Sequence, residues 1–259
     1  MLLVIDCGNT NIVFALSKNE EIVKQWRINT NIKRTADEYS VWLIKLLEIE
    51  NLKLSSISSC IIASVVPEVL LSLKIFNKKY LNINPIVVGE HKLELGIEIN
   101  IETPSEAGAD RLVNAVAVKK FYQKSGIVVD FGTATTFDVV SKNGSYEGGV
   151  IAPGVNLSLE ALYMAASRLP RININNSFNK NVIGKNTKDS MGSGIYWGYI
   201  SLIEGIIEKI KRETQTNYLV IATGGLSNIF SKDCKAIDVV DEDLTINGLI
   251  HIYNINNKK

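Results

Sequence analysis

The chain has 259 residues, of which 46% are hydrophobic, and its formal net charge is +1. This length and composition allow one or two domains with a large core. A near-neutral chain without long runs of like charge does not attract nucleic acid or anionic lipid, so neither is expected as a partner.

Cysteine and histidine usage excludes further classes of protein. The three cysteines are far apart without a C-x-x-C pair, and the sequence holds two histidines, His91 and His251. Neither a disulfide framework nor a Cys/His zinc site is therefore expected. Reduced, buried thiols are typical of the cytosol, and we expect a cytoplasmic protein. The chain begins with a core-like strand that ends in an acid, and its apolar runs are short, so neither a signal peptide nor membrane insertion is expected.

The first half of the chain predicts a three-stranded meander followed by alternating helices and strands. Short apolar runs between turn residues mark the strands, and a Thr-Ala-Asp-Glu start and a Pro-Glu start mark the helices. The expected strands are residues 2–5, 12–16, 21–28, 60–66 and 86–88, and the expected helices begin near Thr35 and Pro67.

The second half repeats this order of elements. It begins with a strand, a tight turn and a second strand, and it contains one long helical pattern. The expected elements are strand–turn–strand at Gly126–Val140, a strand at 146–152, a helix ending near Leu162, a helix from about Met191 to Glu213, and strands at 218–225 and 237–240.

Two similar α/β units are therefore expected, each with a mixed five-stranded sheet and helices on its faces. We place them at residues 1–117 and 118–259, with the junction inside a helix from about Gly108 to Tyr122. Two such units leave a cleft in which a ligand can bind.

An acid and a glycine follow the first strand of each unit, at Asp6 with Gly8 and at Asp130 with Gly132. One such turn alone favours an ordinary hairpin, because glycine and asparagine tolerate positive φ. Two at equivalent positions favour a site in which backbone N–H groups meet phosphate oxygens and a carboxylate handles a metal ion. Cys7, inside the first turn, has no histidine near it in sequence and is interpreted as a buried strand residue.

A third candidate lies at a helix start, in the sequence Gly108-Ala109-Asp110-Arg111. Asp110 and Arg111 can be an ordinary solvated pair, with the acid at the positive end of the helix. They can also form a site, because a carboxylate there can accept a proton from a hydroxyl group and an arginine fork can bind a carboxylate. The residues alone leave these two interpretations about equal.

Taken together, the motifs resemble those of the type III pantothenate kinases. These enzymes are members of the acetate and sugar kinase/Hsc70/actin superfamily, with duplicated RNase H-like (actin-like ATPase) units. The resemblance covers nearly the whole chain. It rests on an ordered set of motifs: DCGNTNIVFAL, GADRLVNAVA, DFGTATTFD, GGVIAPGVNLSLEAL, RLPRI, IGKNTKDSMGSGIYWG, IEGII, IATGGLS and DLTINGLIHIY.

The resemblance implies a kinase that transfers the γ-phosphate of ATP to the 4′-hydroxyl of pantothenate, the first step toward coenzyme A. It implies Mg²⁺ on the nucleotide, a monovalent cation such as K⁺ or NH₄⁺, and a homodimer. In this interpretation Asp110 is the general base, Asp130 binds the monovalent cation, and Asp6 lies near the Mg²⁺. The implied nucleotide-binding residues are Asp6, Cys7, Gly8, Asn9, Thr10, Asn11, Ile12, Val13 and Thr133, and the implied pantothenate-binding residues are Gly108, Ala109, Asp110, Arg111 and Thr187.

One position departs from the family pattern. Three residues before Pro104, where the family often has a tyrosine that contacts the substrate, this chain has Ile101. An aromatic wall or a hydroxyl contact is then missing, which bears on pantothenate affinity and not on the reaction.

Two other functions compete with the kinase. Some proteins of this family are described as accessory factors for transcription, and related RNase H-like units serve as metal-dependent nucleases. The complete set Asp6, Asp110, Arg111, Asp130 and Thr133 argues against a regulator without turnover. The near-neutral charge and the duplicated turns argue against a nuclease.

Apolar residues occur all round the segment from Met191 to Glu213, too many for a single narrow stripe. One face can pack on the sheet of its own unit. The other can be buried in the same chain or in a second copy, and the pattern alone weighs these about equally. The resemblance favours the second copy, a two-fold dimer with the substrate site near its interface.

Overall fold

The computed structural model describes residues 1–90, 93–165, 169–174 and 181–257. His91 and Arg168, the first residue of the RLPRI motif, lie outside the described residues. The chain divides into two compact units, the first made of Met1–Tyr122 and Asp243–Lys259 and the second of Gln123–Glu242.

A mixed five-stranded sheet forms the centre of the first unit. β1 (Leu2–Cys7) runs antiparallel to β2 (Asn11–Lys18) and parallel to β4 (Ser59–Ser64). β3 (Glu21–Asn29) and β5 (Ile86–Val87) form the two edges, which gives the order β3-β2-β1-β4-β5. The meander and the parallel strands that the sequence predicts are confirmed.

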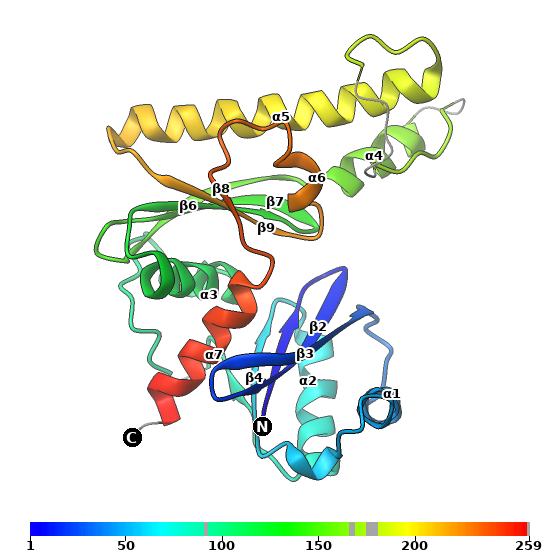
Figure 1. Cartoon of the computed structure of the whole chain (residues 1–259), viewed down its shortest axis with the longest axis vertical. Coiled ribbons are helices and arrows are strands. Elements are labelled where there is room, and N and C mark those ends of the chain that lie inside the picture. Colours follow the sequence, from blue (N-terminus) through cyan, green and yellow to red (C-terminus); the bar gives the residue numbers. More distant parts are fainter. Residues whose placement is uncertain (91–92, 166–168, 175–180, 258–259) are drawn as a thin grey trace. The chain divides into compact units, whose positions relative to one another are not determined.

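Helices cover both faces of this sheet. α1 (Ala36–Ile49) and α2 (Pro67–Phe76) pack on one face, and α3 (Ala109–Ala117) and α7 (Leu244–Asn257) lie side by side on the other (Figure 1). Alternate residues of β1 belong to the two cores, because successive side chains of a strand point to opposite faces. β1 is therefore buried on both sides.

The first helix begins where the sequence predicts, and its start shows why. Thr35 caps it: the Thr35 Oγ1 accepts a hydrogen bond from the Glu38 N–H at 3.3 Å, and the Thr35 N–H donates to Glu38 Oε2 at 2.8 Å. This reciprocal capping box satisfies two backbone N–H donors, each with a side-chain oxygen as the acceptor.

The last helix, α7, belongs to the first unit. The sequence pattern predicts it in the unit of residues 118–259. α7 packs against α3 of the first unit, and Gly248 permits the close approach: a Cβ there would lie 2.6 Å from the Val113 carbonyl oxygen. Thr245 Oγ1 also donates to Asn114 Oδ1 at 2.8 Å. This pairing joins segments far apart in sequence, so no local pattern marks the return of the chain.

The second unit repeats the sheet of the first. β6 (Gly126–Phe131) runs antiparallel to β7 (Ala134–Val140) and parallel to β9 (Leu219–Gly224). β8 (Tyr146–Pro153) and β10 (Val239–Val240) form the edges, in the order β10-β9-β6-β7-β8. The predicted fold class, duplicated α/β units with mixed five-stranded sheets, is confirmed.

The long helix of the second unit, α5 (Thr187–Thr214), lies along one face of this sheet with α4 (Val155–Ala165) (Figure 1). α5 begins one turn earlier than predicted, because Asn186 Oδ1 accepts a hydrogen bond from the Asp189 N–H at 2.9 Å and caps it. The short α6 (Ser227–Phe230) was not predicted. Among the described residues, no helix has the length and apolar character needed to cross a membrane.

Candidate active site

The first acidic turn joins β1 to β2. Asp6 is the penultimate residue of β1, and the last pair of the ladder joins Cys7 to Ile12. The Gly8 N–H donates to the Asn11 carbonyl at 3.0 Å, which closes the turn. Asn9 and Thr10 at its tip are exposed. The turn thus presents backbone and side-chain donors at the end of a rigid, buried strand, as phosphate oxygens require.

Thr30, just beyond the end of β3, braces this turn. Its hydroxyl donates to the Gly8 carbonyl at 2.6 Å, and its backbone N–H donates to the Thr10 carbonyl at 2.9 Å. No local pattern in the sequence marks Thr30, because its two partners are 20 or more positions away in the chain. Two hydrogen bonds from one residue hold both ends of the tip, so the turn is fixed to the third strand.

The start of α3 holds the next two predicted residues. The Arg111 N–H donates to Asp110 Oδ1 at 2.8 Å, so the carboxylate lies against the first turn of the helix. A Cβ at Gly108 would lie 2.6 Å from the same oxygen. A side chain at position 108 would displace the Asp110 carboxylate, which explains the glycine at the residue before the helix.

The structure brings Asp6 and Asp110 together. Asp6 points to the sheet face on which α3 packs, as Leu2 and Val4 do on the same strand. Burial, and then the Asp110 carboxylate, raise the pKa of Asp6 from 3.8 to about 7, while Arg27 opposes the shift. A buried carboxylate with a raised pKa, next to a second carboxylate and a donor-rich turn, marks a candidate site for proton and phosphoryl transfer.

Cys7 takes no part in this chemistry. Its side chain is buried in the core on the opposite face from Asp6. Burial raises the pKa of the Cys7 thiol to about 11, although a hydrogen bond with Ser64 lowers it. A thiol with so high a pKa is a poor nucleophile near neutral pH, in agreement with its interpretation as a buried strand residue.

The second acidic turn is enclosed by glycines. Asp130 is the penultimate residue of β6 and pairs with Thr136 and Thr223 on the neighbouring strands. Gly224 has φ of +86°, and a Cβ there would lie 2.6 Å from Asp130 Oδ1. A Cβ at Gly154 would lie 2.0 Å from the carbonyl oxygen of Thr133, the exposed residue at the tip. Gly224 therefore packs against the acid and the Phe131 backbone, Gly154 packs against the backbone of the turn, and only glycine fits at these two positions.

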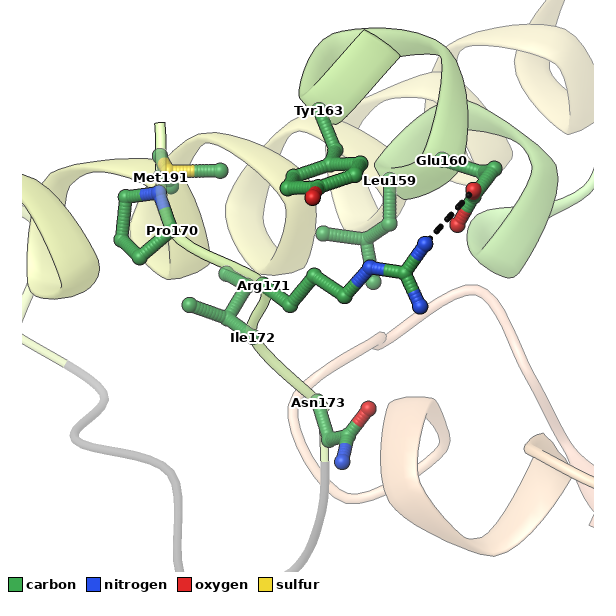
Figure 2. A pocket seen from close by; sticks show the side chains of 8 residues that line it. All are labelled: Leu159, Glu160, Tyr163, Pro170, Arg171, Ile172, Asn173 and Met191. Atoms are coloured by element: carbon green, nitrogen blue, oxygen red, sulfur yellow. Dashed lines mark hydrogen bonds and ion pairs between the residues drawn. The ribbon is translucent and has the colours of Figure 1, made fainter. Parts of the chain in front are cut away.

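Thr187, the remaining predicted site residue, is the exposed first residue of α5. One turn along the helix, Met191 lines a cavity of about 130 Å³ between α4, α5 and the segment that follows α4 (Figure 2). Arg171 crosses this cavity, with its guanidinium carbon 4.6 Å from the centre of the Tyr163 ring and Nη2 3.4 Å from Glu160 Oε1. The predicted site residues do not line the cavity.

The side chains present fit a nucleotide that carries its own metal ion. No group of three or more His, Cys, Asp or Glu side chains able to hold a metal occurs in the part of the chain that the structure describes. Mg²⁺ is usually held by one or two carboxylates together with substrate phosphates, and Asp6 supplies one such carboxylate in the first unit. The two turns supply backbone donors of the kind that phosphates accept.

Comparison with known proteins gives a match over the whole chain. The sequence profile of the family described as Type III pantothenate kinase matches residues 2–209. A Type III pantothenate kinase from Paramagnetospirillum magneticum is 52% identical over 256 residues, which are 99% of this chain and 98% of that protein. One from Phenylobacterium zucineum is 49% identical over 259 residues, 100% of both chains.

Solved structures share the fold at much lower identity. A Baf family transcriptional activator from Campylobacter jejuni has a TM-score of 0.63 and 21% identity, covering 99% of this chain and 100% of that one. Component A of (R)-2-hydroxyglutaryl-CoA dehydratase from Acidaminococcus fermentans has a TM-score of 0.59 and 12% identity, covering 100% and 99%. At these identities the similarities show the fold only.

Proposed function

The chain belongs to the type III pantothenate kinase family, and from this premise we propose that it transfers the γ-phosphate of ATP to the 4′-hydroxyl of pantothenate. The product is 4′-phosphopantothenate, and the reaction is the first step of coenzyme A biosynthesis. The observation that carries the proposal is the Asp6–Asp110 carboxylate pair beside a donor-rich turn.

On the acceptor side, Asp110 is the general base. Its carboxylate takes the proton from the pantothenate hydroxyl as the new P–O bond forms, and the bond from the γ-phosphorus to the departing ADP oxygen breaks. The Arg111 N–H and Gly108 hold the carboxylate in place at the helix start. The Arg111 side chain binds the pantothenate carboxylate, with Gly108, Ala109 and Thr187 as further contacts.

On the donor side, the first turn holds the phosphates. When bound, Mg²⁺ on ATP neutralises phosphate charge and the γ-phosphoryl group is the one transferred. The segment from Asp6 to Val13 would bind the phosphates at its exposed tip, Asn9 and Thr10, while the Gly8 N–H closes the turn on the Asn11 carbonyl. Asp6 would lie near the metal ion, and Thr133 would contact the nucleotide. Thr30 keeps the turn in shape, since it hydrogen-bonds both Gly8 and Thr10.

We place the monovalent cation at Asp130. A carboxylate at the end of a buried strand, enclosed by backbone, suits a hard ion near phosphate groups. The enzyme should work poorly in Na⁺ or Li⁺ buffers and recover in K⁺ or NH₄⁺, and Asp130→Asn should remove this preference. Equal wild-type rates in all four buffers contradict a cation site.

The active enzyme is a homodimer formed through α5. Gly194 and Gly198 are exposed and lie one turn apart on the same helix face. Apart from the neighbouring backbone of α5 itself, no atom of the described residues would lie within 4 Å of a Cβ added at either glycine. A glycine inside a helix costs about 1 kcal/mol relative to alanine, and no side chain of the described residues occupies the space that these two leave. A second copy that packs closely there accounts for both.

Light scattering tests the assembly. The wild type should have the mass of two 28.6 kDa chains, and Gly198→Leu should shift it toward one chain and lower activity. A leucine at Lys53, exposed on the first unit, serves as the control. A fully active species with the mass of one chain overturns the homodimer.

The function itself is tested by incubating the purified protein with MgATP, K⁺ and a panel of acceptors. Pantothenate should give stoichiometric ADP and 4′-phosphopantothenate, and DNA and RNA should remain intact, because the chain is near neutral and offers no basic surface charge excess. The enzyme works in the cytoplasm, where ATP is available and its three buried thiols stay reduced. Failure to phosphorylate pantothenate contradicts the proposal.

A further inference from the structure

Arg27 lies in one cross-strand row with the first acidic residue. In the sheet of the first unit, Asp6 is paired with Val13, and Val13 is paired with Arg27. Directly paired residues of antiparallel strands point to the same face, so the Arg27 side chain leaves the sheet on the face of Asp6. That is also the face on which α3 brings Asp110.

The strand that carries Arg27 is fixed to the phosphate-type turn. Thr30, three residues after Arg27, makes the two hydrogen bonds that hold the turn. Trp26 and Ile28, on either side of Arg27, pack on the opposite face against the core under α1 and α2. The position of the Arg27 backbone relative to Asp6 and the turn is therefore set by sheet register and by packing.

The Arg27 side chain is available for a ligand. It is exposed, and within the described ranges it forms no hydrogen bond and no ion pair, although it attracts the Asp6 carboxylate electrostatically. Lys24 on the same strand, by contrast, is engaged with Glu50 at 2.6 Å. A guanidinium so placed keeps its N–H donors for an incoming group.

The duplicated unit offers an internal comparison. Asp130 is paired with Thr136, and Thr136 is paired with Ile151, so Ile151 holds the position that Arg27 holds in the first unit. Ile151 is 65% exposed and carries no charge. The fold therefore does not need a cation at this edge position, and the arginine is specific to the unit with two carboxylates.

We propose that the Arg27 guanidinium contacts the phosphoryl group in transfer, and that it is a further catalytic residue of the first unit. The proposal rests on the proposed function. A phosphoryl group that approaches Asp6 and Asp110 meets two like charges, and a planar guanidinium that donates to its equatorial oxygens offsets this repulsion. Charge on those oxygens is what stabilising groups bind in phosphoryl transfer. The P–O bond to ADP breaks, the P–O bond to the acceptor forms, the acceptor proton passes to Asp110, and Arg27 stays protonated throughout.

The test compares Arg27→Gln and Arg27→Lys with a control variant that loses a positive charge elsewhere on the same sheet. Lys18 is exposed at the opposite end of the same sheet, and Lys18→Gln serves as the control. For each variant, kcat and the KM values for ATP and pantothenate are measured together with the thermal midpoint. Arg27→Gln should lower kcat by about 10²- to 10³-fold with an unchanged thermal midpoint, in line with the loss of one preorganised donor to the transition state.

Arg27→Lys separates charge from geometry. It should recover part of the lost kcat, because the positive charge remains while the planar fork does not. Lys18→Gln should behave as the wild type. A kcat of Arg27→Gln within twofold of wild type overturns the proposal, as does a loss that appears only in the KM for ATP. A fall in kcat matched by a fall in the thermal midpoint of both Arg27 variants also overturns it, because that result indicates a structural role.

The outcome is distinguishable from failure of the proposed function. If the wild type turns over pantothenate and Arg27→Gln matches it, only the role of Arg27 fails. If the wild type and the Lys18→Gln control both leave pantothenate unmodified, the proposed function fails, and the role of Arg27 falls with it.

Discussion

The two acidic turns have the same backbone position and different surroundings. Asp6 and Asp130 are each the penultimate residue of the central strand of a five-stranded sheet. Asp6 faces a second carboxylate, Asp110, and the guanidinium of Arg27, whereas Asp130 is enclosed by backbone at Gly224. The two units therefore share the backbone position of the acid but differ in the charged side chains around it. For this reason the two turns are suited to different ligands.

The residues that follow the third strand of each unit show the same divergence. Asn29 pairs with Asn11 and Pro153 pairs with Ala134, so Thr30 and Gly154 hold equivalent places. Thr30 braces its turn with a side-chain hydrogen bond to Gly8. Gly154 instead allows backbone to pack on the Thr133 carbonyl. The first turn is held by the Thr30 hydroxyl group, whereas the second is held by close backbone packing that only a glycine at position 154 permits.

The largest effect is expected at Asp110, the second carboxylate of the first unit. Asp110→Asn keeps the size of the side chain and removes its basicity. We expect kcat to fall by about 10²- to 10⁴-fold with the fold retained. Steady-state kinetics and circular dichroism check this, and near-normal kcat in a folded variant removes Asp110 from the role of base.

Asp6→Asn should change how the free energy of unfolding depends on pH. The pKa of Asp6 is raised from 3.8 to about 7 by burial and by Asp110. The unfolded chain loses this proton near pH 4 and the folded chain keeps it to about pH 7, so wild-type stability falls across that window. This rise in the pKa of Asp6 corresponds to a loss of roughly 4 kcal/mol in the free energy of unfolding of the wild type. The asparagine variant does not lose this free energy, because its side chain does not titrate.

The measurement is urea unfolding of both proteins without nucleotide or metal ion, from pH 4 to pH 8. The gap in unfolding free energy between Asp6→Asn and wild type should widen toward pH 7 and then stay level. A gap independent of pH shows that Asp6 is not held in an unfavourable charged state. The variant should also be inactive, which marks Asp6 as retained for function at a cost in stability.

Gly224→Ala tests the enclosure of Asp130. Its φ of +86° is unfavourable for alanine, and the Cβ would also meet Asp130 Oδ1 at 2.6 Å. We expect destabilisation of about 1–3 kcal/mol and a weaker response to K⁺. Gly89→Ala is the matched control, because Gly89 has φ of +90° with open space around the added atom. If the two variants lose equal stability, the close approach of Gly224 to Asp130 and to the Phe131 backbone contributes nothing.

The smallest effect is expected for Ile101→Tyr, in the KM for pantothenate. Ile101 stands where the family often has a substrate-contacting tyrosine, and it is partly buried in the first unit. One neutral hydrogen bond contributes about 1 kcal/mol, so the KM for pantothenate should fall about fivefold while kcat changes little. Ile101→Phe separates the aromatic ring from the hydroxyl. An unchanged KM in both variants shows that this position does not contact pantothenate.

Local patterns account for what the sequence by itself determined. The strand runs, the two Asp-x-Gly turns, the capping box at Thr35 and the order of elements follow from residues within a few positions of one another, and the duplicated order then determined the fold class. The candidate roles of Asp6, Asp110 and Asp130 were also visible there, as acids at strand ends and at a helix start.

The tertiary structure decided which of these residues become neighbours. Sheet register puts Arg27 in the row of Asp6, although they are 21 positions apart in the chain, and packing of α3 brings Asp110 to the same face. Packing at Gly248 likewise placed the last helix in the first unit. Cross-strand pairing and helix packing join residues that are distant in the chain, and a single sequence carries no local signal for such contacts.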